Sequence, residues 1–273
     1  MYVAFDTAAG SASNPNEDFV AASSSVAVVL DGLTAPAALG TSCTHGTPWF
    51  VAQLGSHVLS SATTERDKPL QEIVADAITR VADTHGYTCD LEDPGTPACS
   101  VAIVREGDQG LDYFMLFDSV IVLDGPSDLK VVTDRRVDAV AQDEDLATRA
   151  HPIGSHEHQA RVHKLITAQR RCRNQPGGYW VAAANPAAAY EAVTGSLPRS
   201  LVTRAALLSD GVSCLVERYA AGDWRWLLAI LHRHGPRHVI SRVREAEDTD
   251  PAGARWPRYK RSDDATAAFC LLS

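Results

Sequence analysis

Acidic residues stand at four points where short apolar runs of this sequence begin or end. Glu17-Asp18 precedes FVAA, Asp31-Gly32 follows VAVVL, Asp210-Gly211 follows AALLS, and Asp263-Asp264 precedes ATAAFC. A single Asp-Gly pair is better explained as a turn. Four acidic turns beside apolar strands are costly without cations, because carboxylates near a core lose hydration and repel one another. Hard divalent ions prefer oxygen ligands, so the pattern predicts a carboxylate metal centre.

Cysteine and histidine residues supply two further candidates. Cys43 and His45 follow Asp31 closely, so His45 would either lie near the metal ions as a proton donor or pack in a loop before a helix. Packing is the preferred interpretation. A second group of histidines matches no closed tetrahedral zinc pattern, and we expect a solvated flap there. Its members are His151, His156, His158 and His163.

Apolar periodicity predicts the elements that carry these residues. Alternation in YVAFD, DFVAA and SSVAVVLDG predicts strands, with Val26, Val28 and Leu30 on one face. Helical spacing from Leu70 to Val81 predicts an amphipathic helix at about 68–84, preceded by another at about 47–62. Four consecutive strands are predicted next, in ACSVAIVRE, LDYFMLFD, SVIVLD and LKVVT, and we expect them to form one antiparallel sheet.

The rest of the chain sets the fold class. Residues at about 140–200 are polar and irregular and predict an insertion or flap with one helix. TRAALLSDG then predicts a strand, followed by three helices and a closing strand at 265–273. Strands that alternate with pairs of helices predict an α+β protein, a four-layer α-β-β-α sandwich of two antiparallel sheets with helices outside. No repeat or long linker divides the chain, so we expect one domain, residues 1–273.

Composition excludes several classes of protein. The net charge of -9, from 34 acidic and 25 basic residues, disfavours a nucleic-acid-binding surface. No apolar run is long enough to span a membrane, and MYVAFDTAAG lacks the features of a signal peptide, so we expect a cytoplasmic protein without membrane contacts. The six cysteines form no CxxC pair, which indicates reduced, mostly structural thiols.

Six segments, in order along the chain, resemble motifs of the protein phosphatase 2C (PPM-type) family of metal-dependent serine/threonine phosphatases. They are NED at 16–18, VVLDG at 28–32, TPACSVAIV at 96–104, FDS at 117–119 where the family has Gly-Asp-Ser, LLSDG at 207–211, and DDAT at 263–266. Each motif is weak alone, but the ordered set is specific and spans nearly the whole chain. The chain is similar to an atypical, bacterial-like member, and the resemblance implies the same α-β-β-α sandwich.

The resemblance also implies the catalytic residues Asp31, Asp210 and Asp263. Asp31 would bridge two Mn²⁺ or Mg²⁺ ions, and the Gly32 carbonyl would bind one of them. Asp210 and Asp263 would hold the other ion. In such a centre the metals lower the pKa of a water molecule and orient the phosphate for in-line attack, so no phosphoenzyme is needed.

Three more acidic residues would complete the metal site by resemblance. Glu17 and Asp18 would act near the ions, partly through bound water, and Asp118 matches an acid that helps to hold a weaker third ion. The site for that third ion departs from the family pattern, because Cys214 replaces another acid of the motif and Phe117 replaces the glycine before Asp118.

The groups that face the substrate depart from the family pattern. Ser13 stands where the family has an arginine that clamps the phosphate, and Leu33 stands where a histidine often protonates the leaving group. A basic cluster, Arg170, Arg171 and Arg173, is either a solvated helix face or a replacement clamp carried on a flap.

The sequence therefore predicts a Mn²⁺- or Mg²⁺-dependent phosphomonoester hydrolase. Its substrate would be a phosphoserine or phosphothreonine protein or a small phosphorylated metabolite. The alternative is a weak or inactive phosphatase-fold domain that binds or regulates a phosphorylated partner. The sequence leaves the oligomeric state open.

Overall fold

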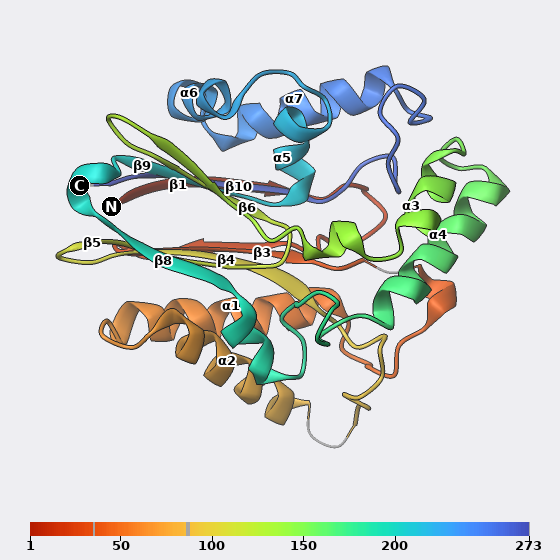
Figure 1. Ribbon diagram of the computed structural model, residues 1–273, viewed down its shortest axis with the longest axis horizontal. Helices are drawn as coiled ribbons and strands as arrows, with labels where there is room; N and C mark the ends of the chain where they lie inside the picture. Colours follow the sequence, from red (N-terminus) through yellow and green to blue (C-terminus); the bar gives the residue numbers. More distant parts are fainter. Residues whose placement is uncertain (35, 86–87, 273) are drawn as a thin grey trace.

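The structure is a computed structural model that describes residues 1–34, 36–85 and 88–272. Two five-stranded sheets are stacked at its centre (Figure 1). Sheet A has the strand order β1-β10-β9-β6-β7 and sheet B the order β2-β3-β4-β5-β8, and every neighbouring pair is antiparallel. The strands are β1 Tyr2–Ala8, β2 Phe19–Ala22, β3 Val26–Gly32, β4 Cys99–Glu106, β5 Gly110–Leu116, β6 Val120–Asp124, β7 Leu129–Val132, β8 Val193–Pro198, β9 Arg204–Leu208 and β10 Ala265–Leu271.

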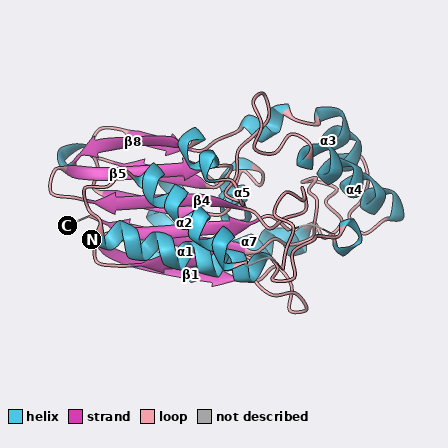
Figure 2. Ribbon diagram, turned by 90° about the horizontal axis from the view of Figure 1, so that it is seen from below, coloured by secondary structure: helices cyan, strands magenta, loops and turns pink. Residues whose placement is uncertain are grey.

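Helices cover the outer face of each sheet (Figure 1). The antiparallel pair α1 and α2 lies on sheet B, and α5, α6 and α7 lie on sheet A, whereas α3 and α4 stand beyond the strand ends (Figure 2). The α-helices are α1 Thr47–Thr64, α2 Leu70–Thr84, α3 Gln142–Arg149, α4 His156–Arg170, α5 Asp210–Glu217, α6 Trp224–His234 and α7 Pro236–Thr249. Short 3₁₀ helices cover Ala37–Leu39, Arg136–Ala139, Pro186–Glu191 and Arg199–Leu201.

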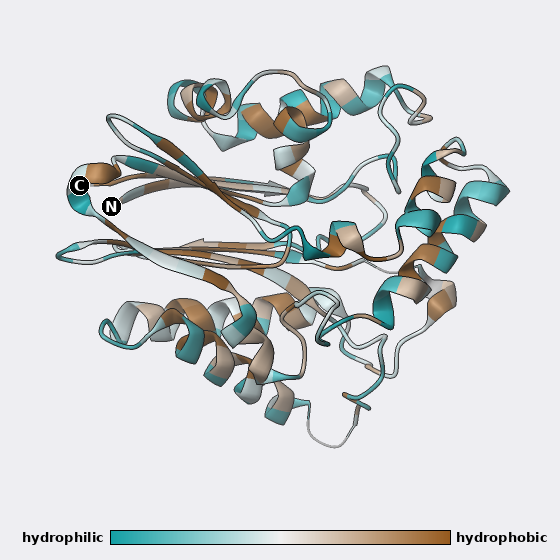
Figure 3. Ribbon diagram, viewed as in Figure 1, coloured by the Kyte–Doolittle hydropathy of each residue, from teal (hydrophilic) through white to brown (hydrophobic). Residues whose placement is uncertain are grey.

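Strand β3 shows why the sheets stack. Its residues are apolar on both faces, so Val28 and Leu30 pack towards α1 and α2 while Ala27 and Val29 pack between the sheets. Figure 3 shows the same hydrophobic character along the central strands. Burying an aliphatic side chain of this size contributes roughly 1.5–3 kcal/mol, which favours covering both faces of the strand. The predicted four-layer α-β-β-α sandwich is confirmed.

The four consecutive strands between 99 and 132 do not form one sheet, and that prediction was wrong. β4 and β5 pair within sheet B, whereas β6 and β7 pair within sheet A. The chain changes sheets over 117–119, because β6 pairs with β9 rather than with β5.

The segment predicted as an insertion at 140–200 is only partly irregular. Helices α3 and α4 project from one end of the sandwich (Figure 2), but β8 pairs with β5 as the edge strand of sheet B. The closing strand is confirmed as far as Leu271, and Ser273 lies outside the described residues. Among the described helices, none is long and apolar enough to cross a membrane.

Candidate metal centre

The acidic residues of the sequence motifs gather at one end of the sandwich. Antiparallel pairing places the end of β3 beside the start of β2, and the end of β9 beside the start of β10. These positions carry Asp31, Asp18, Asp210 and Asp263 in turn. The two sheets are joined there, because the backbone N–H of Asp210 donates to Asp31 Oδ2 over 3.1 Å. The start of β1 and the end of β10 lie at the opposite end (Figure 1).

The environment of Asp18 fits a carboxylate that binds a cation. Its side chain is 9 % exposed, and neither carboxylate oxygen has a hydrogen-bond partner among the described residues. Burial and then the carboxylates of Asp263 and Asp264 raise the pKa of Asp18 to about 8, although the nearby Thr266 hydroxyl offsets part of the effect. A buried carboxylate without a partner is costly, and a bound divalent ion would remove that cost.

The neighbouring carboxyl groups of Asp31 and Asp210 also have raised pKa values. Burial, then the charges of Asp18, Asp210 and Asp263, raise the pKa of Asp31 well above its ordinary value. Burial and then Asp263 raise the pKa of Asp210 to about 6, although Arg218 and Lys260 offset part of the effect. Each keeps some solvent exposure, so ions have access. Carboxylate oxygens that repel one another at an open edge fit hard ions such as Mn²⁺ or Mg²⁺.

Close packing fixes Glu17 beside the end of β3. A side chain at Gly32 would meet the Glu17 backbone oxygen at 2.4 Å, so only glycine allows this approach. Asp264 then holds the segment that leads to Glu17, since its two oxygens accept from the N–H groups of Gly10 and Glu17, each at 2.7 Å. Thr34 donates to the Glu17 carboxylate from the other side.

Asp118 joins the cluster from the turn at which the chain changes sheets. Burial and then the charge of Asp210 raise the pKa of its carboxyl group, and Arg135 partly offsets this effect. The preceding Phe117 has φ 76°, a left-handed conformation that favours glycine. The phenylalanine therefore keeps a glycine-type backbone, and its ring packs against Tyr179 with centroids 5.1 Å apart.

Two cationic residues at the centre were not among the predicted site residues. Lys260 Nζ lies 2.5 Å from Asp263 Oδ1 and also donates to Thr34. Lys260 and Arg218 line a cavity of about 30 Å³ together with Asp210 and Asp263, which is room for a water molecule or two. Lys260 could have been suspected from its position just before the DDAT motif, whereas nothing in the sequence around Arg218 signals its approach.

Solved structures with a similar fold identify the architecture of this chain. The PPM Ser-Thr phosphatase MsPP from Mycobacterium smegmatis, solved with cacodylate, matches with a TM-score of 0.58 at 16% identity over 100% of this chain and 99% of its own. The catalytic domain of the serine/threonine phosphatase PstP, solved with two manganese ions, matches with a TM-score of 0.57 at 14% identity over 100% and 98%. This chain has the PPM phosphatase fold.

Further comparisons agree with that assignment of the fold. Stp1 from Staphylococcus aureus, a serine/threonine phosphatase, matches with a TM-score of 0.58 at 10% identity over 99% of this chain and 94% of its own. No protein-family model matches the sequence, and no curated protein gives a significant sequence match.

Four further residues singled out in the sequence have side chains that are engaged in other contacts. Ser13 is exposed and its hydroxyl contacts Ser11 at 2.8 Å. Leu33 packs against an apolar cluster that includes Phe117 and Tyr179. Arg173 donates to the Thr96 carbonyl over 3.0 Å, which ties it to the loop before β4. Cys214, at the position of an acid in the motif, is buried and its thiol donates to the Gly211 carbonyl.

The histidine candidates separate into two environments. His45 lies in a cluster with Cys43, His85 and Cys89, at the ends of α1 and α2. The expectation of a solvated histidine tract was wrong for His158, which is 2 % exposed and bonds through Nε2 to the Arg258 carbonyl at 3.2 Å. His158 thereby attaches α4 to the loop that carries Lys260, whereas His156 is exposed.

Proposed function

We propose that this protein is a Mn²⁺- or Mg²⁺-dependent phosphomonoester hydrolase whose centre holds two ions. One observation carries the proposal: the Asp18 carboxylate is buried, with no hydrogen-bond partner among the described residues, beside the carboxylates of Asp31, Asp210 and Asp263. Asp31, Asp210 and Asp263 are the proposed catalytic ligands, and Asp118 would serve a weaker third ion. The PPM fold supports this assignment, since PstP with that fold was solved with manganese.

Different residues of the proposed centre would have different roles in hydrolysis. Bound ions would supply activation of water and neutralisation of phosphate charge. The Asp31 carboxylate links the two sheets at the centre, because it accepts a 3.1 Å hydrogen bond from the backbone N–H of Asp210. Lys260 and Arg218, on the cavity beside Asp210, are placed to attract an anion. They are the candidates for the phosphate contact that Ser13 does not supply.

A phosphorylated protein is the preferred substrate class. MsPP and Stp1, which share the fold, are described as serine/threonine phosphatases, and this supports phosphoserine and phosphothreonine substrates. The alternative substrate class is a small phosphorylated metabolite. We propose a single domain that acts in the cytoplasm.

The test is hydrolysis of p-nitrophenyl phosphate and of a phosphopeptide panel, with and without Mn²⁺. Wild-type protein should release phosphate only with the metal, and Asp31→Asn should lose at least about 10²-fold in kcat. The control Asp248→Asn changes an exposed carboxylate that pairs with Arg261. Metal-independent turnover, or turnover that survives Asp31→Asn, would contradict the proposal.

A second candidate is a phosphatase-fold domain that binds a phosphorylated partner without hydrolysing it. The contact of Lys260 with Asp263 favours it, because the ammonium group already neutralises one ligand of the centre. Under this alternative a phosphopeptide would bind in calorimetry while no phosphate appears with any divalent ion.

A further inference from the structure

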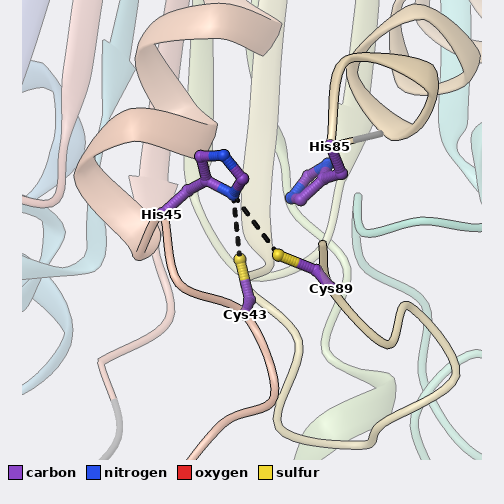
Figure 4. A group of neighbouring side chains, drawn as sticks. All are labelled: Cys43, His45, His85 and Cys89. Carbon is purple, nitrogen blue, oxygen red and sulfur yellow. Dashed lines mark hydrogen bonds between the residues drawn. The ribbon is translucent and has the colours of Figure 1, made fainter. Parts of the chain in front are cut away.

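Four metal-binding side chains converge at a second place, between the start of α1 and the end of α2. Cys43 and His45 come from the loop that enters α1, His85 from the end of α2, and Cys89 from the loop that follows. One ligand atom of each lies within 4.8 Å of the others. Figure 4 shows the two thiols and two rings pointing towards a common centre.

The spacing of these atoms fits a tetrahedral zinc ion. Bonds of about 2.3 Å to sulfur and about 2.1 Å to nitrogen, at a tetrahedral angle, put sulfur and nitrogen about 3.6 Å apart. His45 Nδ1 lies 3.8 Å from Cys43 Sγ and 3.4 Å from Cys89 Sγ. These two sulfur–nitrogen distances lie just above and just below the value expected for tetrahedral zinc ligands.

The second histidine is oriented to donate a lone pair. His85 Nδ1 lies 2.8 Å from the Val81 carbonyl oxygen, which can only accept, so Nδ1 carries the proton and Nε2 is a free acceptor. His85 is 3 % exposed, and its Nε2 is buried with no hydrogen-bond partner in the described part of the chain. A backbone carbonyl that fixes the tautomer of a ligating histidine is the usual outer support of a metal site.

Other contacts shape the surroundings of the cluster. Trp49 stacks on His45 with centroids 4.3 Å apart and meets the edge of His85 at 4.8 Å, so both rings have fixed orientations. The backbone N–H of Thr44 donates to Cys89 Sγ at 3.4 Å. Such a bond stabilises a thiolate, the form of cysteine that binds metal.

We propose that Cys43, His45, His85 and Cys89 bind one structural zinc ion. Two sulfur and two nitrogen ligands select zinc over the hard ions that suit the carboxylate centre. The protein fills all four positions, which is the pattern of structural rather than catalytic zinc.

The ion would join two loops that flank the carboxylate centre. The first connects the end of β3, which carries Asp31, to α1, and the second connects α2 to β4, whose Cys99 pairs with Gly32. The same loops already touch where Asp93 accepts from the N–H of Ser42 at 2.6 Å. A zinc crosslink here would hold the start of α1 against the end of α2 and stabilise the fold.

The experiment measures zinc in the full chain by elemental analysis after purification without chelators. Wild-type protein should carry about one zinc per chain, and Cys89→Ser or His85→Ala should reduce this below about 0.2 and lower Tm. Cys172→Ser, a half-buried cysteine outside the cluster, and Asp31→Asn should both keep the zinc. Since Asp31→Asn damages only the carboxylate centre, zinc binding is tested separately from phosphatase activity.

A second measurement covers the case in which the ligand variants fail to fold. Cobalt added to wild-type protein stripped of zinc should give thiolate charge-transfer absorption and a tetrahedral visible spectrum, and zinc should abolish both. The proposal is overturned if zinc-free protein has the Tm of the purified form and gives no such spectrum. A Cys43–Cys89 disulfide found by mass spectrometry in metal-free purified protein would overturn it equally.

Discussion

At the scale of single residues, Lys260 would compete with a bound metal ion for Asp263. Its ammonium group lies 2.5 Å from Asp263 Oδ1, so an incoming ion must displace it or share the carboxylate. We expect Lys260→Met to bind Mn²⁺ about 10-fold more tightly, a change of about 1.4 kcal/mol, because the competing cation is gone. Calorimetric titration measures this change. The control is Arg261→Met, which removes a neighbouring cation paired with Asp248, and an unchanged affinity in Lys260→Met would contradict the competition.

The raised pKa of Asp18 predicts how stability depends on pH. Folding raises this pKa from 3.8 to about 8, chiefly through burial, so the folded protein holds a proton that the unfolded chain has lost. Stability of the metal-free protein should therefore fall as the pH rises from about 4 to about 8. Thermal unfolding at a series of pH values measures the slope.

Two comparisons identify the source of that slope. Asp18→Asn cannot ionise, so its Tm should vary less with pH across the same range. Saturating Mn²⁺ should reverse the wild-type trend, because the ion binds the deprotonated carboxylates. Equal slopes in wild type and Asp18→Asn would place the titration elsewhere.

At the scale of elements, the turn between β5 and β6 decides which sheet each strand joins. Sequence patterns identified both strands but not the change of sheet, because alternation records only which residues are apolar, not which neighbour a strand pairs with. The turn's distinctive residue, Phe117, has φ 76° and gave no signal, since phenylalanine is rare in that conformation. Only the resemblance drew attention to this position, because the family has a glycine where this chain has Phe117.

Replacements at Phe117 separate its backbone strain from its packing. Phe117→Ala should destabilise the protein by about 3 kcal/mol, because the ring that packs against Tyr179 is lost. Phe117→Gly loses the same ring but relieves the left-handed strain, worth about 1 kcal/mol. The glycine variant should therefore be the more stable of the two in urea unfolding, although glycine usually destabilises relative to alanine. The opposite order would show that strain at this turn is negligible.

At the scale of the whole molecule, the two clusters differ in how far sequence could predict them. Asp18, Asp31, Asp210 and Asp263 each follow or precede an apolar strand, so strand ends that meet at one edge made their convergence predictable. In the thiol and imidazole cluster, the sequence singled out Cys43 and His45 but gave no signal that joins them to His85 and Cys89. The two halves of the cluster, 43–45 and 85–89, are separated by the whole of the helical pair α1 and α2, and no CxxC spacing marks either half. Only the antiparallel packing of these helices brings them together.

The position of Leu33 predicts which phosphate esters the whole centre can hydrolyse. Its side chain packs against the apolar cluster of Phe117 and Tyr179, and its N–H is held by the Ala98 carbonyl at 2.9 Å, so no proton donor stands there. A leaving alcohol of high pKa needs a proton in the transition state, whereas a phenolate does not. We expect kcat/KM for p-nitrophenyl phosphate to exceed that for an alkyl phosphate of similar size by at least about 10²-fold.

Replacement of Leu33 tests the cause of this preference. Leu33→His should raise kcat on alkyl phosphates and leave aryl phosphates nearly unchanged, because only the former need the proton. Leu33→Asn is the matched control, since it adds polarity at the same place without a group that titrates near neutral pH. If both variants raise kcat equally on alkyl and aryl phosphates, Leu33 acts by limiting steric access of the substrate and not by the lack of a proton donor. If wild-type protein already hydrolyses alkyl and aryl esters equally well, another residue donates the proton, and Lys260 beside Asp263 is the first to replace.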